Sequence, residues 1–179
     1  MNVGSLARRY AKAVLSIGIE DHSYEKLASE LSELGALLEN EELADVLSTP
    51  TVPLSQRRAI VDELLARLRP SDTVRRTTLL LLEKGRVAAL PEIAREFNAL
   101  VDEHVGRVRA EVTSARRLAP AQVAKLKQTI EQLTGKTVLL SEKTDKDLIA
   151  GMVTKVGSVL YDGSARTRLS ELQRSLLDN

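Results

Sequence analysis

The 179-residue chain has no cysteine and no tryptophan, and its aromatic residues are one phenylalanine and three tyrosines. Without cysteine there is no disulfide framework and no thiolate metal site, so the sequence says nothing about a redox compartment. With so few aromatic side chains, the core has to be built from Leu, Val, Ile and Ala, which favours packed helices over an aromatic-rich β sandwich. The length is sufficient for one ordinary domain or two small ones.

Long apolar runs are missing as well. The run Leu79–Leu82 is four residues long, and no longer one occurs, whereas a transmembrane helix needs about 20 apolar residues. The start, MNVGSLARRYAKAV, has a basic pair but is followed by no apolar core of signal-peptide length and no small-residue cleavage site. We therefore expect a chain without a membrane span or a targeting leader, either cytosolic or peripheral to a membrane.

Charge is nearly balanced over the whole chain but unevenly distributed along it. Residues 1–105 contain 13 Lys and Arg against 17 Asp and Glu, a net charge of −4, and residues 106–179 contain 13 against 8, a net charge of +5. This asymmetry predicts two domains with different partners, the second of which prefers an acidic surface. A chance imbalance over a solvated surface is an equally good interpretation of the same numbers.

The first part of the chain shows helical periodicity. Leu6, Tyr10, Ala13, Val14 and Ile17 recur at spacings of three and four, which predicts an amphipathic helix with these residues as its apolar stripe. Similar patterns predict five more helices before residue 105. Ser5 is available to cap the first helix, and Ser71-Asp72 the fifth. Pro91 stands in the first turn of the sixth helix, where proline is tolerated. Six short helices with tight connections predict a compact bundle.

The pattern changes after Gly106. The stretches VRAEVTSA, TVLLSEK and GMVTKVGSVLY predict three extended segments. A helix that begins at Pro120 and ends at Gly135 separates the first two. Gly151 and Gly157 mark points where the third segment is expected to bend or bulge.

Ser164 is available to cap a final helix. The predicted fold class is therefore mainly α with a small α+β part. It consists of an N-terminal six-helix bundle over residues 1–105 and a C-terminal β-α-β-β-α domain over residues 106–179.

Familiar catalytic patterns are incomplete. The stretch TGKT ends like a phosphate-binding loop, but Ile130 stands where that loop needs its first glycine. His22 and His104 are far apart and have no third ligand; His104, on the apolar stripe of a helix, is interpreted as a partly buried packing residue. No serine stands in a Gly-x-Ser-x-Gly elbow. We expect no catalytic residue, no cofactor and no metal.

Nucleic-acid binding is a weaker interpretation than protein binding. The arginine pairs are scattered and diluted by acidic residues, and few aromatics are present for base stacking. Adjacent arginines on a helix diverge by about 100° and are typical of a solvated face. The residues by themselves indicate a non-catalytic two-domain binding protein. A free-standing protein-interaction or nucleic-acid-binding module remains the alternative.

Two stretches carry a resemblance to a known family. ARRYAKAVLSIGIE near the start and DKDLIAGMVTKVGSVLYDGSARTRLSELQRSL near the end resemble the delta subunit of F-type ATP synthases, the bacterial relative of the mitochondrial oligomycin-sensitivity-conferring protein. The C-terminal motif is specific: an acidic turn, a small residue plus glycine, alternating apolar residues, then Asp-Gly-Ser and Arg-Leu. Ala150 stands where many relatives have a first glycine, and the resemblance covers nearly the whole chain.

The resemblance implies a non-catalytic stator subunit, present in one copy per complex. Such a subunit joins the catalytic head to the peripheral stalk, so that the head does not turn with the rotor and proton-driven rotation is coupled to ATP synthesis. It implies that the first and fifth helices dock the N-terminal helix of an alpha subunit, and that the C-terminal domain meets the C-termini of the b subunits. It also implies a peripheral membrane protein on the cytoplasmic face of the bacterial inner membrane, with no nucleic-acid partner.

The resemblance directs attention to two groups of residues. The candidates for the alpha-subunit groove are Tyr10, Ala11, Val14 and Leu79. The candidates for stalk docking or domain architecture are Gly151, Lys155, Asp162, Gly163, Ser164, Arg168 and Leu169. Asp162-Gly163 is expected to turn the chain, with Gly163 at positive φ, before Ser164 caps the final helix. Alternatively, this turn only completes the fold and contacts nothing.

Overall fold

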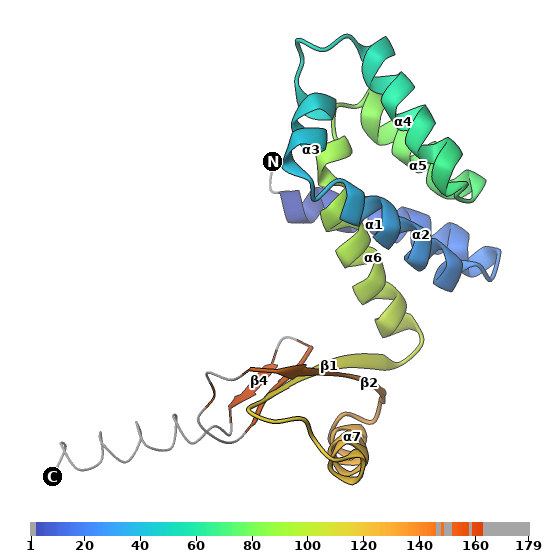
Figure 1. Ribbon diagram of the computed structural model, residues 1–179. Helices are drawn as coiled ribbons and strands as arrows, with labels where there is room; N and C mark the ends of the chain where they lie inside the picture. The colour runs from blue at the N-terminus through green and yellow to red at the C-terminus, as the bar shows by residue number, and fades with distance from the viewer. Residues whose placement is uncertain (1–2, 146–147, 149–151, 158, 163–179) are drawn as a thin grey trace, which may run out of the picture. The chain divides into compact units, whose positions relative to one another are not determined.

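The computed structural model describes residues 3–145, 148, 152–157 and 159–162. The chain divides into two compact units, Met1–Val101 and Asp102–Asn179. The division lies within the last helix of the first part, a few residues before the predicted boundary at Gly106. In its described residues the protein is mainly helical with a small β part (Figure 1), in agreement with the predicted class.

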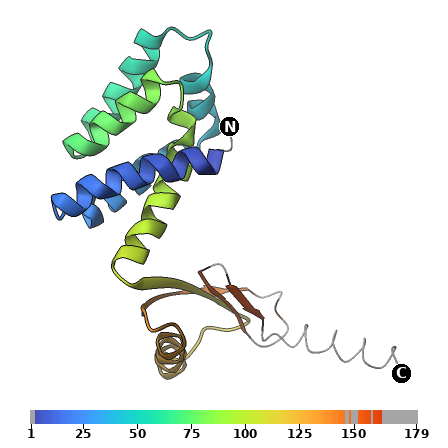
Figure 2. The ribbon, with the colours of Figure 1, turned by 180° about the vertical axis from the view of Figure 1, so that it is seen from behind.

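Six α-helices precede the first strand in the described chain. They are α1 (Val3–Glu20), α2 (Tyr24–Leu37), α3 (Glu41–Ser48), α4 (Leu54–Leu68), α5 (Asp72–Glu83) and α6 (Leu90–His104), with a short 3-10 helix, η1 (Val87–Ala89), before α6. Helix α1 packs against α2 and α5, α4 packs against α5, and α3 packs against η1. Figure 2 shows α1, in dark blue, on the near side of the first unit with α5 beside it.

Two predicted caps differ from the structure. Ser5 lies inside α1, because that helix begins at Val3. Ser71 precedes α5 but forms no side-chain cap bond with it; instead its backbone N–H and its hydroxyl donate to Oε2 of Glu30, on α2, at 2.9 and 2.6 Å. A carboxylate from another helix thus lies at the positive end of α5, where negative charge is favourable.

The first unit has one aliphatic core to which all six helices contribute. Its single phenylalanine, Phe97, is fully buried. Other large, fully buried side chains of this core include Leu27, Leu31, Leu47, Leu81, Leu82, Leu90 and Ile93. This composition matches the expectation drawn from the scarcity of aromatic residues.

The buried side of α1 is not the one that the periodicity predicts. Small residues face the core, namely Ala7, Ala11, Val14 and Gly18. The rest of the predicted stripe is half-buried or exposed, and it consists of Leu6, Tyr10, Ala13 and Ile17, here called the α1 outer stripe. Small side chains let the helices approach closely: a Cβ added at Gly18 would lie 2.9 Å from Cδ1 of Leu27 and 3.1 Å from Cα of Tyr24. The close contact with α2 therefore decides which side of α1 is buried.

The second unit contains a four-stranded sheet in the order β2-β1-β3-β4. Its elements are β1 (Arg107–Ser114), α7 (Pro120–Thr134), β2 (Thr137–Thr144), β3 (Met152–Val156) and β4 (Val159–Asp162). Strands β1 and β2 are parallel and joined through α7, whereas β3 is antiparallel to both β1 and β4.

One segment of the second unit corrects the predicted order. The stretch read as a single extended segment with a bend is a hairpin, in which Val156 pairs with Val159. Gly157 stands in the tight turn with φ of 57°, a left-handed conformation that glycine adopts without steric cost. The described order is therefore β-α-β-β-β. The predicted final helix lies outside the described residues.

The second core is small. Ala110, Ile130 and Val138 are buried between α7 and one face of the sheet, with partly buried Val108, Leu126, Leu140 and Val156 around them. On the opposite face of the sheet, the register places a set of exposed side chains that includes those of Arg109, Glu111, Leu139 and Lys155. Among the described residues, this unit therefore has much less buried apolar surface than the first unit has.

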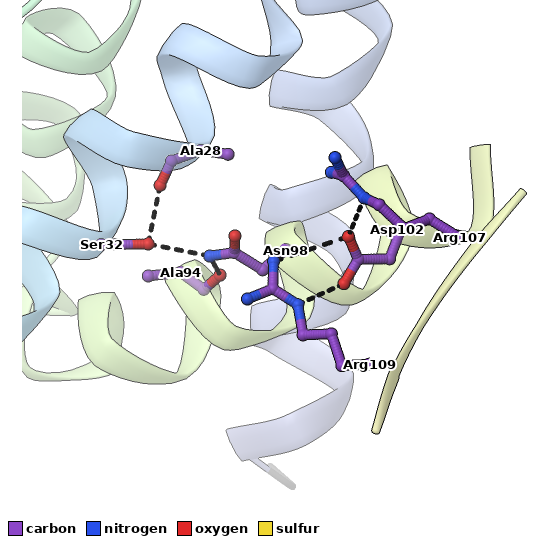
Figure 3. Close-up of polar contacts among 7 residues, drawn as sticks. All are labelled: Ala28, Ser32, Ala94, Asn98, Asp102, Arg107 and Arg109. Carbon is purple, nitrogen blue, oxygen red and sulfur yellow. Dashed lines mark hydrogen bonds and ion pairs between the residues drawn. The ribbon is translucent and has the colours of Figure 1, made fainter. Parts of the chain in front are cut away.

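A buried carboxylate holds the start of the sheet. Asp102, in the last turn of α6, is 7% exposed, and its Oδ1 accepts from Nε of Arg107 at 2.8 Å. Its Oδ2 accepts from Nε of Arg109 (Figure 3). Between Asp102 and these arginines, Gly106 turns the chain with φ of 63°. Because a buried charge needs charged or hydrogen-bonding partners, these two arginines stabilise the reversal from helix to strand.

A second polar contact in Figure 3 lies within the first unit. The amide nitrogen of Asn98, on α6, donates to Oγ of Ser32 at 2.9 Å and to the carbonyl of Ala94 at 2.8 Å. The Ser32 hydroxyl donates in turn to the carbonyl of Ala28 at 2.7 Å. This chain of hydrogen bonds joins α6 to α2 beside the close approach of Gly35 to Ala94.

The close packing at Gly18 predicts a difference between two glycine substitutions in the same helix. Gly4→Ala meets no atom within 4 Å and is expected to raise the free energy of unfolding by up to about 1 kcal/mol, because alanine has the higher helix propensity. Gly18→Ala gains the same propensity but overpacks the contact with α2, so it is expected to be about 1–3 kcal/mol less stable than Gly4→Ala. Chemical denaturation monitored by circular dichroism measures both. Equal gains for the two variants would contradict the packing account.

The Asp102 cluster predicts a local loss of stability. Asp102→Asn removes the charge that two arginines share, and it is expected to cost about 1–3 kcal/mol, toward the lower end because Arg109 is solvent-accessible. The loss is expected in the second unit, as faster hydrogen exchange of β1 amides. Glu63→Gln is the matched control, since it removes an exposed pair with Arg67 that is worth less than about 1 kcal/mol. Unchanged β1 exchange in Asp102→Asn would refute the proposed role of the carboxylate.

Candidate partner-binding surfaces

The four candidates for the first surface lie on α1 and α5, which pack against each other. Tyr10 and Leu79 are half-buried at the edge of the core. Ala11 and Val14 are buried, with exposed fractions of 0% and 3%. A partner that approached this surface would reach Tyr10 and Leu79, whereas Ala11 and Val14 lie beneath it and determine how closely α1 sits on the core.

Both helices also carry an exposed aliphatic side chain. Ile17, at the far end of the α1 outer stripe, is 43% exposed, and so is Leu80 on α5. Positions 6, 10, 13 and 17 lie on one side of a helix with 3.6 residues per turn. The outer stripe is therefore a continuous apolar line on α1. The sequence signal for this outer stripe is the parallel line of small residues at positions 7, 11 and 18. Small residues allow that side of α1, rather than the outer stripe, to pack closely on the core.

One hydrogen bond orients the tyrosine of this surface. The hydroxyl of Tyr10 accepts from Nη1 of Arg86 at 3.1 Å. Arg86 follows α5, 76 positions along the chain from Tyr10, so no local pattern could have predicted the pair. The bond places a guanidinium at the edge of an otherwise apolar surface.

The candidates in the second unit are only partly described. Lys155 is exposed on β3, where the register places it beside Glu111 of β1 and Leu160 of β4. Asp162 is the last residue of β4 and pairs with Val153. The remaining candidates lie outside the described residues, and they are Gly151, Gly163, Ser164, Arg168 and Leu169. The turn at Asp162-Gly163 and its cap remain predictions.

The glycine of TGKT and the two histidines, to which the sequence analysis gave no catalytic role, all lie in the described part of the structure. Gly135 is the C-cap of α7 with φ of 65°, as predicted for the glycine of TGKT. His22 lies in the turn after α1, with φ of 51°. His104 is exposed at the end of α6, so its interpretation as a packing residue is wrong. The part of the chain that the structure describes contains no cluster of three His, Cys, Asp or Glu side chains that could hold a metal ion.

No helix in the described part of the chain combines the length and the apolar character that crossing a membrane requires.

Two of the four adjacent arginine pairs, Arg57-Arg58 and Arg75-Arg76, make contacts within the protein. Arg57 of α4 donates from Nη1 to the carbonyl of Leu47 at the end of α3, at 3.2 Å. Arg58 lies 3.8 Å from Asp62 and 3.6 Å from Glu83. In α5, Arg76 pairs with Asp72 at 2.5 Å. Arg57 and Arg58 thus connect α4 to neighbouring helices, and Arg76 forms an ion pair within α5.

Comparison with known proteins gives the same family as the sequence motifs. The family model described as ATP synthase delta (OSCP) subunit matches residues 6–176. An ATP synthase subunit delta from Anaeromyxobacter sp. (strain Fw109-5) is 42% identical over 177 residues, which cover 98% of this chain and 99% of the relative. Another, from Geobacter metallireducens, is 39% identical over 170 residues, or 94% of both chains.

A solved structure shares the fold. A chain in the cryo-EM structure of the Toxoplasma gondii mitochondrial ATP synthase hexamer superposes with a TM-score of 0.72. The match covers 96% of this chain and 97% of that one at 22% sequence identity, so it is evidence for the fold alone. The family match over residues 6–176 and the two relatives show that the chain belongs to the ATP synthase delta (OSCP) subunit family.

Proposed function

We propose that this protein is the non-catalytic stator subunit of an F-type ATP synthase. It links the catalytic head to the peripheral stalk, so that the head does not turn with the rotor and proton-driven rotation is coupled to ATP synthesis. The observation that carries the proposal is agreement with ATP synthase delta subunits over nearly the whole length of both chains. One copy per complex, on the cytoplasmic face of the bacterial inner membrane, is part of the proposal.

An adaptor of this kind needs two separate binding surfaces on one chain. Two compact units, each with a hydrophobic cluster of its own, are consistent with this requirement. In the proposed arrangement, helices of residues 1–105 form a bundle that docks the head, and residues 106–179 dock the stalk. The opposite net charges of these two regions support different partners.

The N-terminal helix of an alpha subunit is the proposed partner of the first unit. An amphipathic helix commonly binds with its apolar face in a groove between two helices. The α1 outer stripe, next to α5, offers the apolar line that such a helix needs, and Tyr10 and Leu79 lie at its contact with the core. The Tyr10–Arg86 bond adds a polar group that can fix the orientation of the docked helix.

The proposed partner of the second unit is the C-terminal region of the b subunits. Lys155, the turn at Asp162-Gly163 and the following Ser164, Arg168 and Leu169 are proposed to contribute to that contact or to the architecture behind it. The nucleic-acid-binding alternative is less well supported, because several of the arginines that it would use pair with carbonyl or carboxylate groups of the protein itself.

The first docking surface can be tested with one charge. Ile17→Asp places a carboxylate in the outer stripe, and desolvating it on binding is expected to weaken affinity for the alpha-subunit N-terminal peptide by roughly tenfold or more. Leu54→Asp is the matched control, because Leu54 is 44% exposed, as Ile17 is 43%, but lies at the start of α4. Isothermal titration calorimetry of the full chain with a synthetic peptide measures both.

Circular dichroism melting curves establish that both variants are folded. Equal affinity of Ile17→Asp and the unmodified chain would exclude the outer stripe as the docking surface. Failure of the unmodified chain to bind either the peptide or the intact head would contradict the proposed function itself.

A further inference from the structure

A pocket lies in the first unit where α4 ends and α5 begins, and its volume is about 310 Å³. It is lined by the last two turns of α4, the turn that follows and the first turn of α5. We call it the α4–α5 pocket, and its lining residues are Asp62, Leu65, Ala66, Arg69, Pro70 and Arg75. None of the residues proposed for head or stalk docking is among them.

The carboxylates of α4 and α5 are all paired with arginines. The pairs are Asp62 and Glu83 with Arg58, Glu63 with Arg67, and Asp72 with Arg76. Of the other arginines in this part of the chain, Arg57 donates to the carbonyl of Leu47. Arg69 and Arg75 are left, and their guanidinium groups have no hydrogen-bond or ion-pair partner among the described residues. Both of these unneutralised cations line the α4–α5 pocket.

The rest of the α4–α5 pocket is mostly apolar. Leu65 is 5% exposed and Pro70 is half-buried. The positive end of α5 is not the source of the pocket's charge, because Oε2 of Glu30 already accepts from the backbone N–H and the hydroxyl of Ser71 there. The positive potential of the pocket therefore comes from its two guanidinium groups.

We propose that the α4–α5 pocket binds a small organic phosphate. A phosphate monoester carries a charge of about −1.5 to −2 at neutral pH, which matches two guanidinium groups better than the single charge of a carboxylate does. The planar guanidinium also binds phosphate oxygens through two parallel N–H···O bonds. This site goes beyond the proposed function, because it requires neither the head nor the stalk.

The size and the remaining polar group of the pocket describe the rest of the ligand. Its volume corresponds to roughly ten water molecules of liquid, which is more than a bare phosphate ion fills. Leu65 and Pro70 provide an apolar surface for an organic group. Asp62 disfavours a ligand that is negative throughout, and its carboxylate can accept a hydrogen bond from a hydroxyl group. A nucleoside monophosphate or a sugar phosphate has all of these properties.

The test is an NMR titration of the full-length, ¹⁵N-labelled chain with AMP, inorganic phosphate and acetate. AMP and phosphate are expected to shift the amide signals of residues 62–75. AMP is expected to bind more tightly than phosphate, because its nucleoside also covers the apolar part of the pocket. Acetate, with a single charge, is expected to bind most weakly.

Two double variants separate the pocket from general charge. Arg69→Gln with Arg75→Gln removes the two unpaired cations. Arg67→Gln with Arg76→Gln is the matched control, because it removes the same charge from arginines that are paired and do not line the pocket. The first variant is expected to bind AMP and phosphate at least roughly tenfold more weakly, and the control within about threefold of the unmodified chain.

A third variant tests the shape of the pocket without changing its charge. Ala66→Leu places a larger side chain at the lining, so it is expected to weaken AMP more than phosphate. Circular dichroism melting curves establish that all variants are folded. Binding of the alpha-subunit peptide is expected to be unchanged in each of them, so this site and the proposed function fail or hold separately.

Several results would overturn the inference. One is the absence of any shift in residues 62–75 with AMP and phosphate up to about 10 mM, a concentration that detects even millimolar affinity. Equal losses in the two double variants would show that only net charge matters, and acetate binding as tightly as phosphate would indicate a carboxylate site. Vesicles of phosphatidylglycerol that bind through Arg69 and Arg75, with AMP and phosphate not bound, would assign the pocket to a lipid headgroup.

Discussion

The close contact between α1 and α2 is the constraint from which the proposed head-binding surface follows. Ala7, Ala11 and Gly18 present so little side chain that α1 lies directly against the core. A helix has only one side that can face the core, and this side is occupied by its small residues. The larger apolar residues of α1 are left on the neighbouring side, where they are half-buried or exposed. A surface of this kind is costly in a monomer unless a partner covers it.

The second unit uses a different source of stability. The apolar core of its described residues is small, and polar contacts hold the start of its sheet: Asp102 bonds to two arginines of β1 beside the turn at Gly106. The loop before α7, one side of α7 and the end of β2 line an open pocket in this unit.

Local patterns predicted the helix ends well where a proline or a glycine marks them. Pro91, Pro120 and Gly135 stand at the helix ends that the sequence assigned to them. The predictions failed where partners come from distant positions. Ser71 bonds to Glu30, 41 positions away, and the buried side of α1 was decided by contact with α2. The hairpin at Gly157 was read as a bend, because a turn of two residues leaves almost no interruption in an apolar pattern.

The central claim is that one chain binds head and stalk at the same time through different units. Native mass spectrometry of a mixture of the full-length chain, the catalytic head and the soluble part of the b subunits tests this claim directly. The account predicts a complex that contains all three components, with a single copy of this chain. Only binary complexes, with the head and the b subunits displacing one another, would show that they compete for one surface and would contradict the account.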